Sequence, residues 1–173
     1  MEGGKHINWT WLWNEWIRPL GSAVILALFI IVFVGQSFKV EGVSMENTLF
    51  DGERLMVDKL TYRFRNPRRG EIIVLNVPRA RFIKRIIAVE GDIIEERRGV
   101  IFLNSKPLDE PYVDNKTNMS WGPIVVPEGH VWVMGDNRPR SDDSRGSVGF
   151  LPIDKIVGRA VFRYWPLNRL GRP

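Results

Sequence analysis

The sequence predicts a mainly β protein with one N-terminal transmembrane helix, followed by an antiparallel β-barrel or folded sheet. Three observations support this fold class: an apolar run over residues 20–38, many short β-rich runs after it, and glycine- or proline-rich turns between those runs. Short strands separated by such turns are typical of antiparallel architectures. A chain of 173 residues has room for one compact domain and a short appendage.

The apolar run is long enough to cross a bilayer as one helix. Its only polar side chains are Ser22, Gln36 and Ser37, and a spanning α-helix needs about 20 consecutive apolar residues. Four tryptophans precede it within residues 9–16, and such rings settle at the membrane–water interface. The alternative is a cleavable signal peptide, with a shorter apolar region and a small-x-small cleavage site. Residues 36–41 contain no Ala-x-Ala, which favours a retained anchor.

The chain therefore divides into three expected segments. Residues 1–18 form a cytoplasmic or interfacial segment, residues 19–38 the transmembrane helix, and residues 39–173 an extracytoplasmic β domain. Positive residues lie on both sides of the apolar run, so they indicate its orientation only weakly. The net charge of +5 suits either nucleic acid or an anionic lipid surface. With an anchor present, we expect the lipid bilayer as the partner and no nucleic acid.

Seven β-rich runs after the anchor are expected to be strands. They cover residues 55–57, 71–75, 82–89, 100–103, 124–126, 130–134 and 156–164. Residues 106–123 are rich in proline, asparagine and aspartate, so we expect them to form a surface excursion between strands.

Few residues could perform covalent chemistry. The chain has no cysteine, and its two histidines leave few candidates for the base of a Ser-His-Asp site. Ser44 in Gly-Val-Ser-Met is a candidate nucleophile, although a serine beside a glycine can simply satisfy a turn. A serine nucleophile needs a base within hydrogen-bond reach, and Lys84 is the candidate for that base.

Lys84 lies in the expected strand 82–89, where alternate side chains share a face. Its amine should therefore lie beside Phe82, Ile86 and Ala88. Burial disfavours the ammonium form, and a lysine whose pKa falls from about 10.4 toward 7–8 can act as a base at neutral pH. The strand by itself favours the alternative, an edge lysine that keeps its charged end in water.

The loop over residues 135–146 is dense in Gly, Asp, Asn and Ser. One interpretation is a solvated turn held by its own salt bridges. The other is a functional element that supplies a hydroxyl to orient a lysine and ion pairs to stiffen a site.

Together these segments resemble the type I signal peptidase family, serine–lysine proteases that remove signal peptides from exported proteins. The resemblance rests on five features in order: the anchor, Gly-x-Ser-Met, the Arg-Gly-Glu-Ile-Ile-Val strand, the Phe-Ile-Lys-Arg strand with its following Gly-Asp, and the loop Gly-Asp-Asn-Arg…Ser-x-Asp-Ser-Arg. Each motif alone is weak, but five in sequence are specific. The short catalytic region and single anchor resemble the compact Gram-positive form.

The resemblance implies a role for each candidate residue. Ser44 is the expected nucleophile, and its backbone N–H one oxyanion donor. Lys84 is the expected general base, which later protonates the leaving amine. Ser141 occupies the position of the hydroxyl that orients the lysine, and Asp143 and Arg145 occupy the positions of a structural ion pair. No cofactor or metal is expected.

Two positions depart from the family pattern. Some members carry a serine two residues before the nucleophile, where this chain has Gly42, so its second oxyanion donor stays open. Asn47 replaces the proline of the usual Ser-Met-x-Pro-Thr-Leu, which we expect to affect turn rigidity more than chemistry.

The resemblance also implies a substrate and a location. A preprotein signal peptide would bind as an added strand, and bulky apolar walls would admit only small residues at the −1 and −3 positions. The expected substrate-binding residues are Phe38, Val40, Gly42, Met45, Leu49, Phe82 and Ile83. The expected location is the bacterial cytoplasmic membrane, with the N-terminus cytoplasmic, the catalytic domain outside, and the secretion machinery nearby.

Three other functions compete with this interpretation. A self-cleaving repressor of the SOS type would need a DNA-binding helical domain, where this chain has an apolar segment. An anchored β domain that only binds a partner would tolerate loss of Ser44 and Lys84. An inactive homologue is disfavoured because both of these positions are filled.

Overall fold

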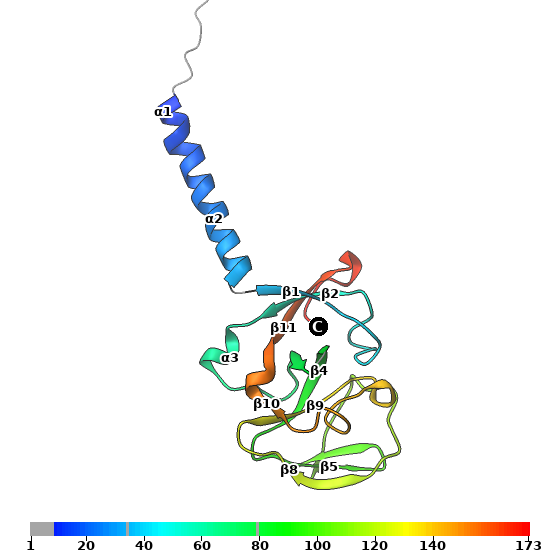
Figure 1. Ribbon diagram of the computed structural model, residues 1–173. Helices are drawn as coiled ribbons and strands as arrows, with labels where there is room; N and C mark the ends of the chain where they lie inside the picture. Colours follow the sequence, from blue (N-terminus) through cyan, green and yellow to red (C-terminus); the bar gives the residue numbers. More distant parts are fainter. Residues whose placement is uncertain (1–8, 34, 79) are drawn as a thin grey trace, which may run out of the picture. The chain divides into compact units, whose positions relative to one another are not determined.

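The computed structural model of the chain describes residues 9–33, 35–78 and 80–173 (Figure 1). The chain divides into two compact units, Met1–Gln36 and Ser37–Pro173. Residues 1–8 of the expected interfacial segment and residue 34 of the expected anchor lie outside the described residues.

Residues 9–33 of the N-terminal unit are helical. They comprise α1 (Trp9–Leu12), the π-helical turn η1 (Trp13–Ile17) and α2 (Arg18–Phe33). Within the part of the chain that the structure describes, no helix combines the length and apolar character needed to span a membrane. The expected helix over residues 19–38 is wrong at its C-terminal end, because strand β1 (Gly35–Lys39) follows α2. Glycine has a low helix propensity, so Gly35 is a natural place for the helix to stop.

The larger of the two sheets has seven strands. Its strand order is β1-β2-β11-β3-β4-β9-β10, so β1 and β10 end it and the sheet stays open. Of the two expected architectures, the folded sheet is therefore the one present. Beyond β1, its strands are β2 (Arg54–Asp58), β3 (Ile72–Val77), β4 (Ala80–Val89), β9 (His130–Met134), β10 (Leu151–Pro152) and β11 (Ile156–Trp165).

A smaller sheet has the order β7-β6-β5-β8. Its strands are β5 (Ile93–Arg97), β6 (Val100–Leu103), β7 (Lys106–Pro107) and β8 (Trp121–Val125). The short helices of the second unit are α3 (Thr61–Phe64), η2 (Arg138–Arg140), η3 (Ile153–Lys155) and η4 (Leu167–Arg169). Every expected strand overlaps a strand of the structure, and the paired strands whose register is described run antiparallel.

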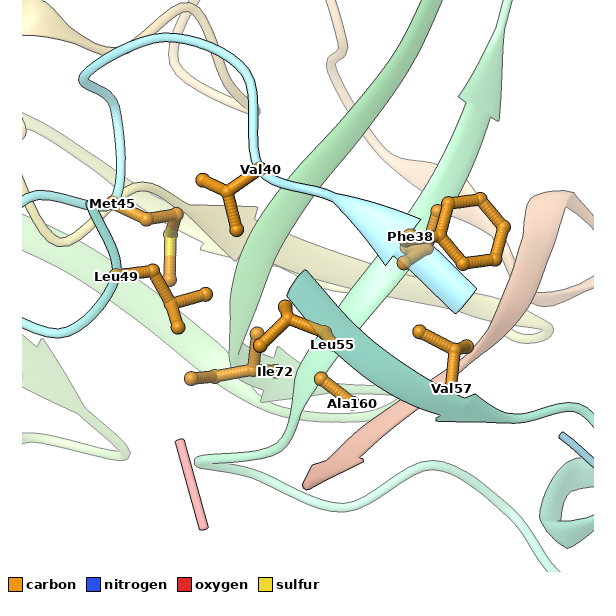
Figure 2. Close-up of a cluster of buried hydrophobic side chains, with 9 residues drawn as sticks. Phe38, Val40, Met45, Leu49, Leu55, Val57, Ile72 and Ala160 are labelled. Atoms are coloured by element: carbon orange, nitrogen blue, oxygen red, sulfur yellow. The ribbon is translucent and has the colours of Figure 1, made fainter. Parts of the chain in front are cut away.

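Strand β4 separates two hydrophobic clusters. Ile83 packs against the cluster drawn in Figure 2, whereas Phe82 and Ile86 belong with a second cluster around Ile73. The members of the Figure 2 cluster are Phe38, Val40, Met45, Leu49, Leu55, Val57, Ile72, Val74 and Ala160. Alternation along β4 therefore places Lys84 on the side of Phe82 and Ile86.

The expectation that Ala88 shares this face is wrong. The pairing of β4 with β9 is irregular between Ile86 and Ala88. Such an irregularity shifts the alternation of the side chains that follow it. Ala88 accordingly packs in a third cluster with Ile87, Ile94 and Trp132.

Candidate active site

Ser44 lies in a turn between β1 and β2 that the core holds in place. The carbonyl of Met45 accepts hydrogen bonds from the N–H groups of Thr48, at 3.1 Å, and Leu49, at 2.8 Å. The side chains of Met45 and Leu49 are buried in the Figure 2 cluster. Gly42 precedes the turn with φ of +84°, which suits glycine, and donates its N–H to Asp51 Oδ1 at 2.8 Å.

Lys84 on β4 reaches this turn. Its Nζ donates a hydrogen bond to Ser44 Oγ at 2.7 Å, and the residue is only 2% exposed. Burial lowers the pKa of Lys84 to about 8, although the charge of Asp143 opposes the shift. A lysine with such a pKa is neutral in an appreciable fraction of molecules near neutral pH, and a neutral amine at hydrogen-bond distance can accept the hydroxyl proton.

Ser141 lies beside the turn that carries Ser44. A Cβ atom at Gly135 would overlap both Ser141 Oγ and the carbonyl oxygen of Ser44, so the missing side chain allows these groups to approach. Ser141 Oγ is buried and makes no hydrogen bond of standard geometry with a described residue, although it lies close enough to Asp143 to help lower the pKa of that carboxyl. The structure therefore places Ser141 near the backbone carbonyl of Ser44, while its orienting role stays a prediction.

Asp143 and Arg145 form a buried ion pair in the same loop. Arg145 donates from Nε to Asp143 Oδ1 at 2.9 Å and from Nη2 to Oδ2 at 2.8 Å. Asp143 also accepts the N–H of Gly135 at 3.0 Å. Burial alone would raise the pKa of Asp143, but the hydrogen bond and charge of Arg145 outweigh it and lower that pKa. The pair fixes the backbone at Gly135, next to Ser141.

Asn137 holds the turn of Ser44, a contact that the sequence did not indicate. Its backbone N–H donates to the carbonyl of Ser44 at 3.1 Å, and its Nδ2 donates to the carbonyl of Val43 at 3.1 Å. Nδ2 also donates to Glu46 Oε2 at 3.1 Å. The motif Gly-Asp-Asn identified the segment, but no sequence signal indicated which residue contacts the turn.

Arg85, the neighbour of Lys84, carries a second link between β4 and the turn. It donates to Asp136 from Nε at 2.9 Å and from Nη2 at 2.7 Å. Thr48 Oγ1 donates to Asp136 Oδ2 at 2.5 Å. The guanidinium also stacks on the Tyr112 ring, 4.0 Å from its centroid. Two-point pairs of this kind fix geometry as well as charge.

A buried pair joins the excursion over residues 106–123 to the loop of the site. Arg138 donates to Glu110 at 3.1 Å and 2.6 Å and to the carbonyl of Gly135 at 3.0 Å. Both partners are almost fully buried. The expected surface excursion therefore also has a structural contact with the site, which its polar composition did not indicate.

The expected pocket walls divide into two groups. Phe38, Val40, Met45 and Leu49 are buried in the Figure 2 cluster, so the core takes up most of their surface. Gly42 is exposed, and Phe82 and Ile83 are half-buried. Among the described residues, no cluster of three or more His, Asp and Glu side chains has the arrangement of a metal site.

Half of β4 offers an open edge beside Lys84. Residues 80–85 pair with β3 on one side, whereas the pairing with β9 on the other side begins only at Arg85. The backbone of residues 80–84 therefore has one edge without a neighbouring strand in the sheet, and such an edge can accept an added chain.

Comparison with known proteins places these features in a family. The family model described as "Signal peptidase, peptidase S26" matches residues 13–165. A signal peptidase I of Leptolyngbya laminosa is 40% identical over 167 residues, covering 91% of this chain and 82% of the relative. A signal peptidase I of Bacillus licheniformis is 35% identical over 170 residues, covering 91% of each chain.

A solved structure was also matched. The crystal structure of a signal peptidase I from Enterococcus faecalis V583 has 31% identity and a TM-score of 0.49, and the match covers 55% of this chain and 97% of that one. The family model and the two sequence relatives span most of the chain. The chain therefore belongs to the signal peptidase family, peptidase S26, and is a hydrolase of the serine peptidase class.

Proposed function

We propose that this chain removes N-terminal signal peptides from preproteins, with Ser44 as nucleophile and Lys84 as general base. The observation that carries the proposal is the 2.7 Å hydrogen bond between Lys84 Nζ and Ser44 Oγ. A second observation supports the proposal: burial lowers the pKa of Lys84 to about 8. These are the two requirements of a serine nucleophile: a base within reach, and a pKa matched to neutral pH.

The reaction proceeds in two stages. Neutral Lys84 takes the Ser44 proton as Oγ attacks the scissile carbonyl, and the resulting ammonium gives a proton to the leaving amine. Water, activated by the same amine, then hydrolyses the acyl-enzyme. The Ser44 N–H donates to no acceptor among the described residues, so it is free to stabilise the oxyanion. Ser141 orients the lysine, and the ion pair of Asp143 and Arg145 supports that loop.

The substrate binds as an added strand along the open edge of β4. Backbone hydrogen bonds to residues 80–84 supply affinity, and side-chain pockets supply specificity. Gly42, Phe82 and Ile83 keep exposed surface beside the dyad. They contact the residues before the scissile bond and restrict the −1 and −3 positions to small side chains.

The apolar N-terminal segment attaches the enzyme to the bacterial cytoplasmic membrane, with the catalytic domain outside and the secretion machinery nearby. The support is the composition of residues 20–38 and the tryptophans before it. Ten residues separate Phe33, the end of α2, from Ser44, so a short stretch of chain tethers the nucleophile to the proposed membrane segment.

The test is cleavage of a purified preprotein by the full chain, compared with Ser44→Ala, Lys84→Ala and Lys84→Arg. All three variants should lose activity. The guanidinium cannot deprotonate in the working range, so a positive charge at position 84 does not substitute for a base. Cleavage by Ser44→Ala at the wild-type rate would contradict the nucleophile, and substantial activity in Lys84→Arg would contradict the general base.

A further inference from the structure

Two arginines near the C-terminus contact the turn that carries Ser44. Arg163 Nη1 donates to the carbonyl of Thr48 at 3.0 Å and to Glu53 Oε2 at 3.3 Å. Arg169 Nη1 donates to Glu53 Oε1 at 2.6 Å, and its Nη2 lies 3.4 Å from the carbonyl of Thr48. Two cations thus meet one carboxylate and one carbonyl at the end of the turn.

The carboxylate at the centre of this cluster is shielded from water. The side chain of Glu53 is 3% exposed, that of Arg163 12% and that of Arg169 32%. Hydrogen bonds between ionised groups are short and strong. Removing one partner of a buried carboxylate strongly destabilises the folded protein. The cluster therefore resists displacement of either arginine.

The C-terminal segment is folded back so that both arginines reach the same place. Arg163 and Gly171 exchange backbone hydrogen bonds of 2.7 Å and 3.1 Å. The Nε of Arg163 donates to the carbonyl of Arg169 at 2.5 Å. Arg169 also stacks on Phe50, 4.4 Å from the ring centroid. The helix η4 is thereby held against the chain that follows the turn.

Thr48 connects this cluster to the dyad. Its N–H closes the turn onto Met45, the residue after Ser44, and its hydroxyl donates to Asp136. Asp136 in turn pairs with Arg85, the residue after Lys84. The carbonyl of Thr48 is the third polar group of that residue, and the two arginines occupy it. Thr48 is thus fixed from the side of Lys84 and from the C-terminal segment.

We propose that Glu53, Arg163 and Arg169 form a positioning clamp that sets the turn of residues 44–48 at the place where Ser44 Oγ meets Lys84 Nζ. The clamp does not touch the reacting atoms and acts through Thr48. Its effect on catalysis rests on the function proposed above for Ser44 and Lys84, whereas its effect on the turn does not. A displacement of about 1 Å at a reacting group can cost about a hundredfold in rate.

The test compares Arg169→Gln with Arg172→Gln in the full chain. Both changes remove one positive charge from the C-terminal segment, but Arg172 has no hydrogen bond or ion pair with a described residue. Arg169→Gln should lower kcat for preprotein cleavage about tenfold, leave KM within about twofold, and leave the pH at half-maximal rate unchanged. Arg169→Lys should recover part of kcat, because an ammonium reaches Glu53 but lacks the fork that also reaches Thr48. Arg172→Gln should match the wild type.

Amide hydrogen exchange over residues 43–50 gives a readout that does not depend on activity. Arg169→Gln should speed exchange of the Thr48 and Leu49 amides, which close the turn, and Arg172→Gln should not. A lower Tm with unchanged exchange and unchanged kcat would make the cluster merely structural and overturn the proposal. Faster exchange with unchanged kcat would overturn it as well. If wild-type protein fails to cleave preproteins, the proposed function fails, and unchanged exchange in Arg169→Gln would separately overturn the clamp.

Discussion

Lys84 Nζ lies 2.7 Å from Ser44 Oγ, although 40 positions separate the two residues in the chain. Lys84 belongs to β4 of the seven-stranded sheet, and Ser44 belongs to a turn packed on the core. Their meeting therefore depends on every contact that fixes the turn against β4.

The rate of preprotein cleavage should rise with pH through a pKa near 8. Lys84 acts as a base only when neutral, so activity is lost as pH falls below the value of about 8 that burial gives this pKa. The measurement is kcat/KM against pH, which reports groups of the free enzyme. A limb that appears only above about pH 10, where an ordinary lysine titrates, would contradict the buried base.

Lys84→Met should abolish cleavage and stabilise the fold at neutral pH. Burial lowers the pKa of Lys84 from 10.5 to about 8, so the folded protein binds this proton more weakly than the unfolded chain does. Stability then rises with pH between those two values, and at pH 7 the depressed pKa corresponds to about 3 kcal/mol of destabilisation. Methionine has a similar shape and no charge. Urea unfolding should therefore give a gain of about 1–3 kcal/mol at pH 7.

The control for this gain is the same measurement at pH 10 or above. There the wild-type lysine is neutral in the folded state, so the difference between Lys84→Met and wild type should shrink. A gain that is equal at both pH values would show that packing, rather than charge, separates the two proteins.

Gly135→Ala should impair catalysis through the turn of Ser44. The added Cβ would overlap both Ser141 Oγ and the Ser44 carbonyl oxygen, so both groups, or the backbone of Gly135 itself, must move. We expect kcat to fall by about a hundredfold, as for a misplacement of about 1 Å at the reacting group. Gly21→Ala is the matched control, because no heavy atom lies within 4 Å of a Cβ at that position. An unchanged kcat in Gly135→Ala would mean that the site tolerates the displacement.

The sequence predicted much of the fold because its strands carry alternating or continuous apolar residues. Strand β5 (Ile93–Arg97) was missed, since three of its five residues are charged. Glu96 is nonetheless buried, because it accepts hydrogen bonds from Thr117 at 2.6 Å and Trp121 at 2.7 Å. Periodicity cannot reveal a strand whose buried carboxylate is satisfied by residues more than twenty positions away.

In the candidate site, too, the sequence identified some residues and not others. Ser44 and Lys84 could be proposed from motifs, since their chemistry restricts which residue types can serve. Asn137 and Arg169 could not, because each acts through a contact with the backbone of a distant segment. Met45 was expected to line a pocket because it is adjacent to Ser44, yet its side chain is buried in the core. A position next to Ser44 in the sequence does not determine whether a side chain faces the substrate or the core.

Asn47 supports a conformation of the turn that proline cannot adopt. It is the third residue of the turn closed by the hydrogen bond from Thr48 N–H to the Met45 carbonyl, and its φ is +86°. A positive φ at this position is typical of a type II turn, which favours Gly or Asn, whereas proline is fixed near −65°. The expectation that Asn47 changes turn rigidity is therefore incomplete, because it also sets the backbone conformation between Ser44 and Thr48.

Asn47→Pro should consequently lower both kcat and stability, even though proline is the usual residue in the family motif that this turn resembles. Asn47→Gly should keep kcat within about twofold, because glycine adopts positive φ readily. Asn47→Ala should lie between them, since alanine lacks both the conformational freedom of glycine and the short polar side chain that lets asparagine tolerate positive φ. The measurements are kcat for preprotein cleavage and the urea midpoint of each variant. A proline variant as active and stable as the wild type would show that the turn can change to a negative φ without moving Ser44 away from Lys84.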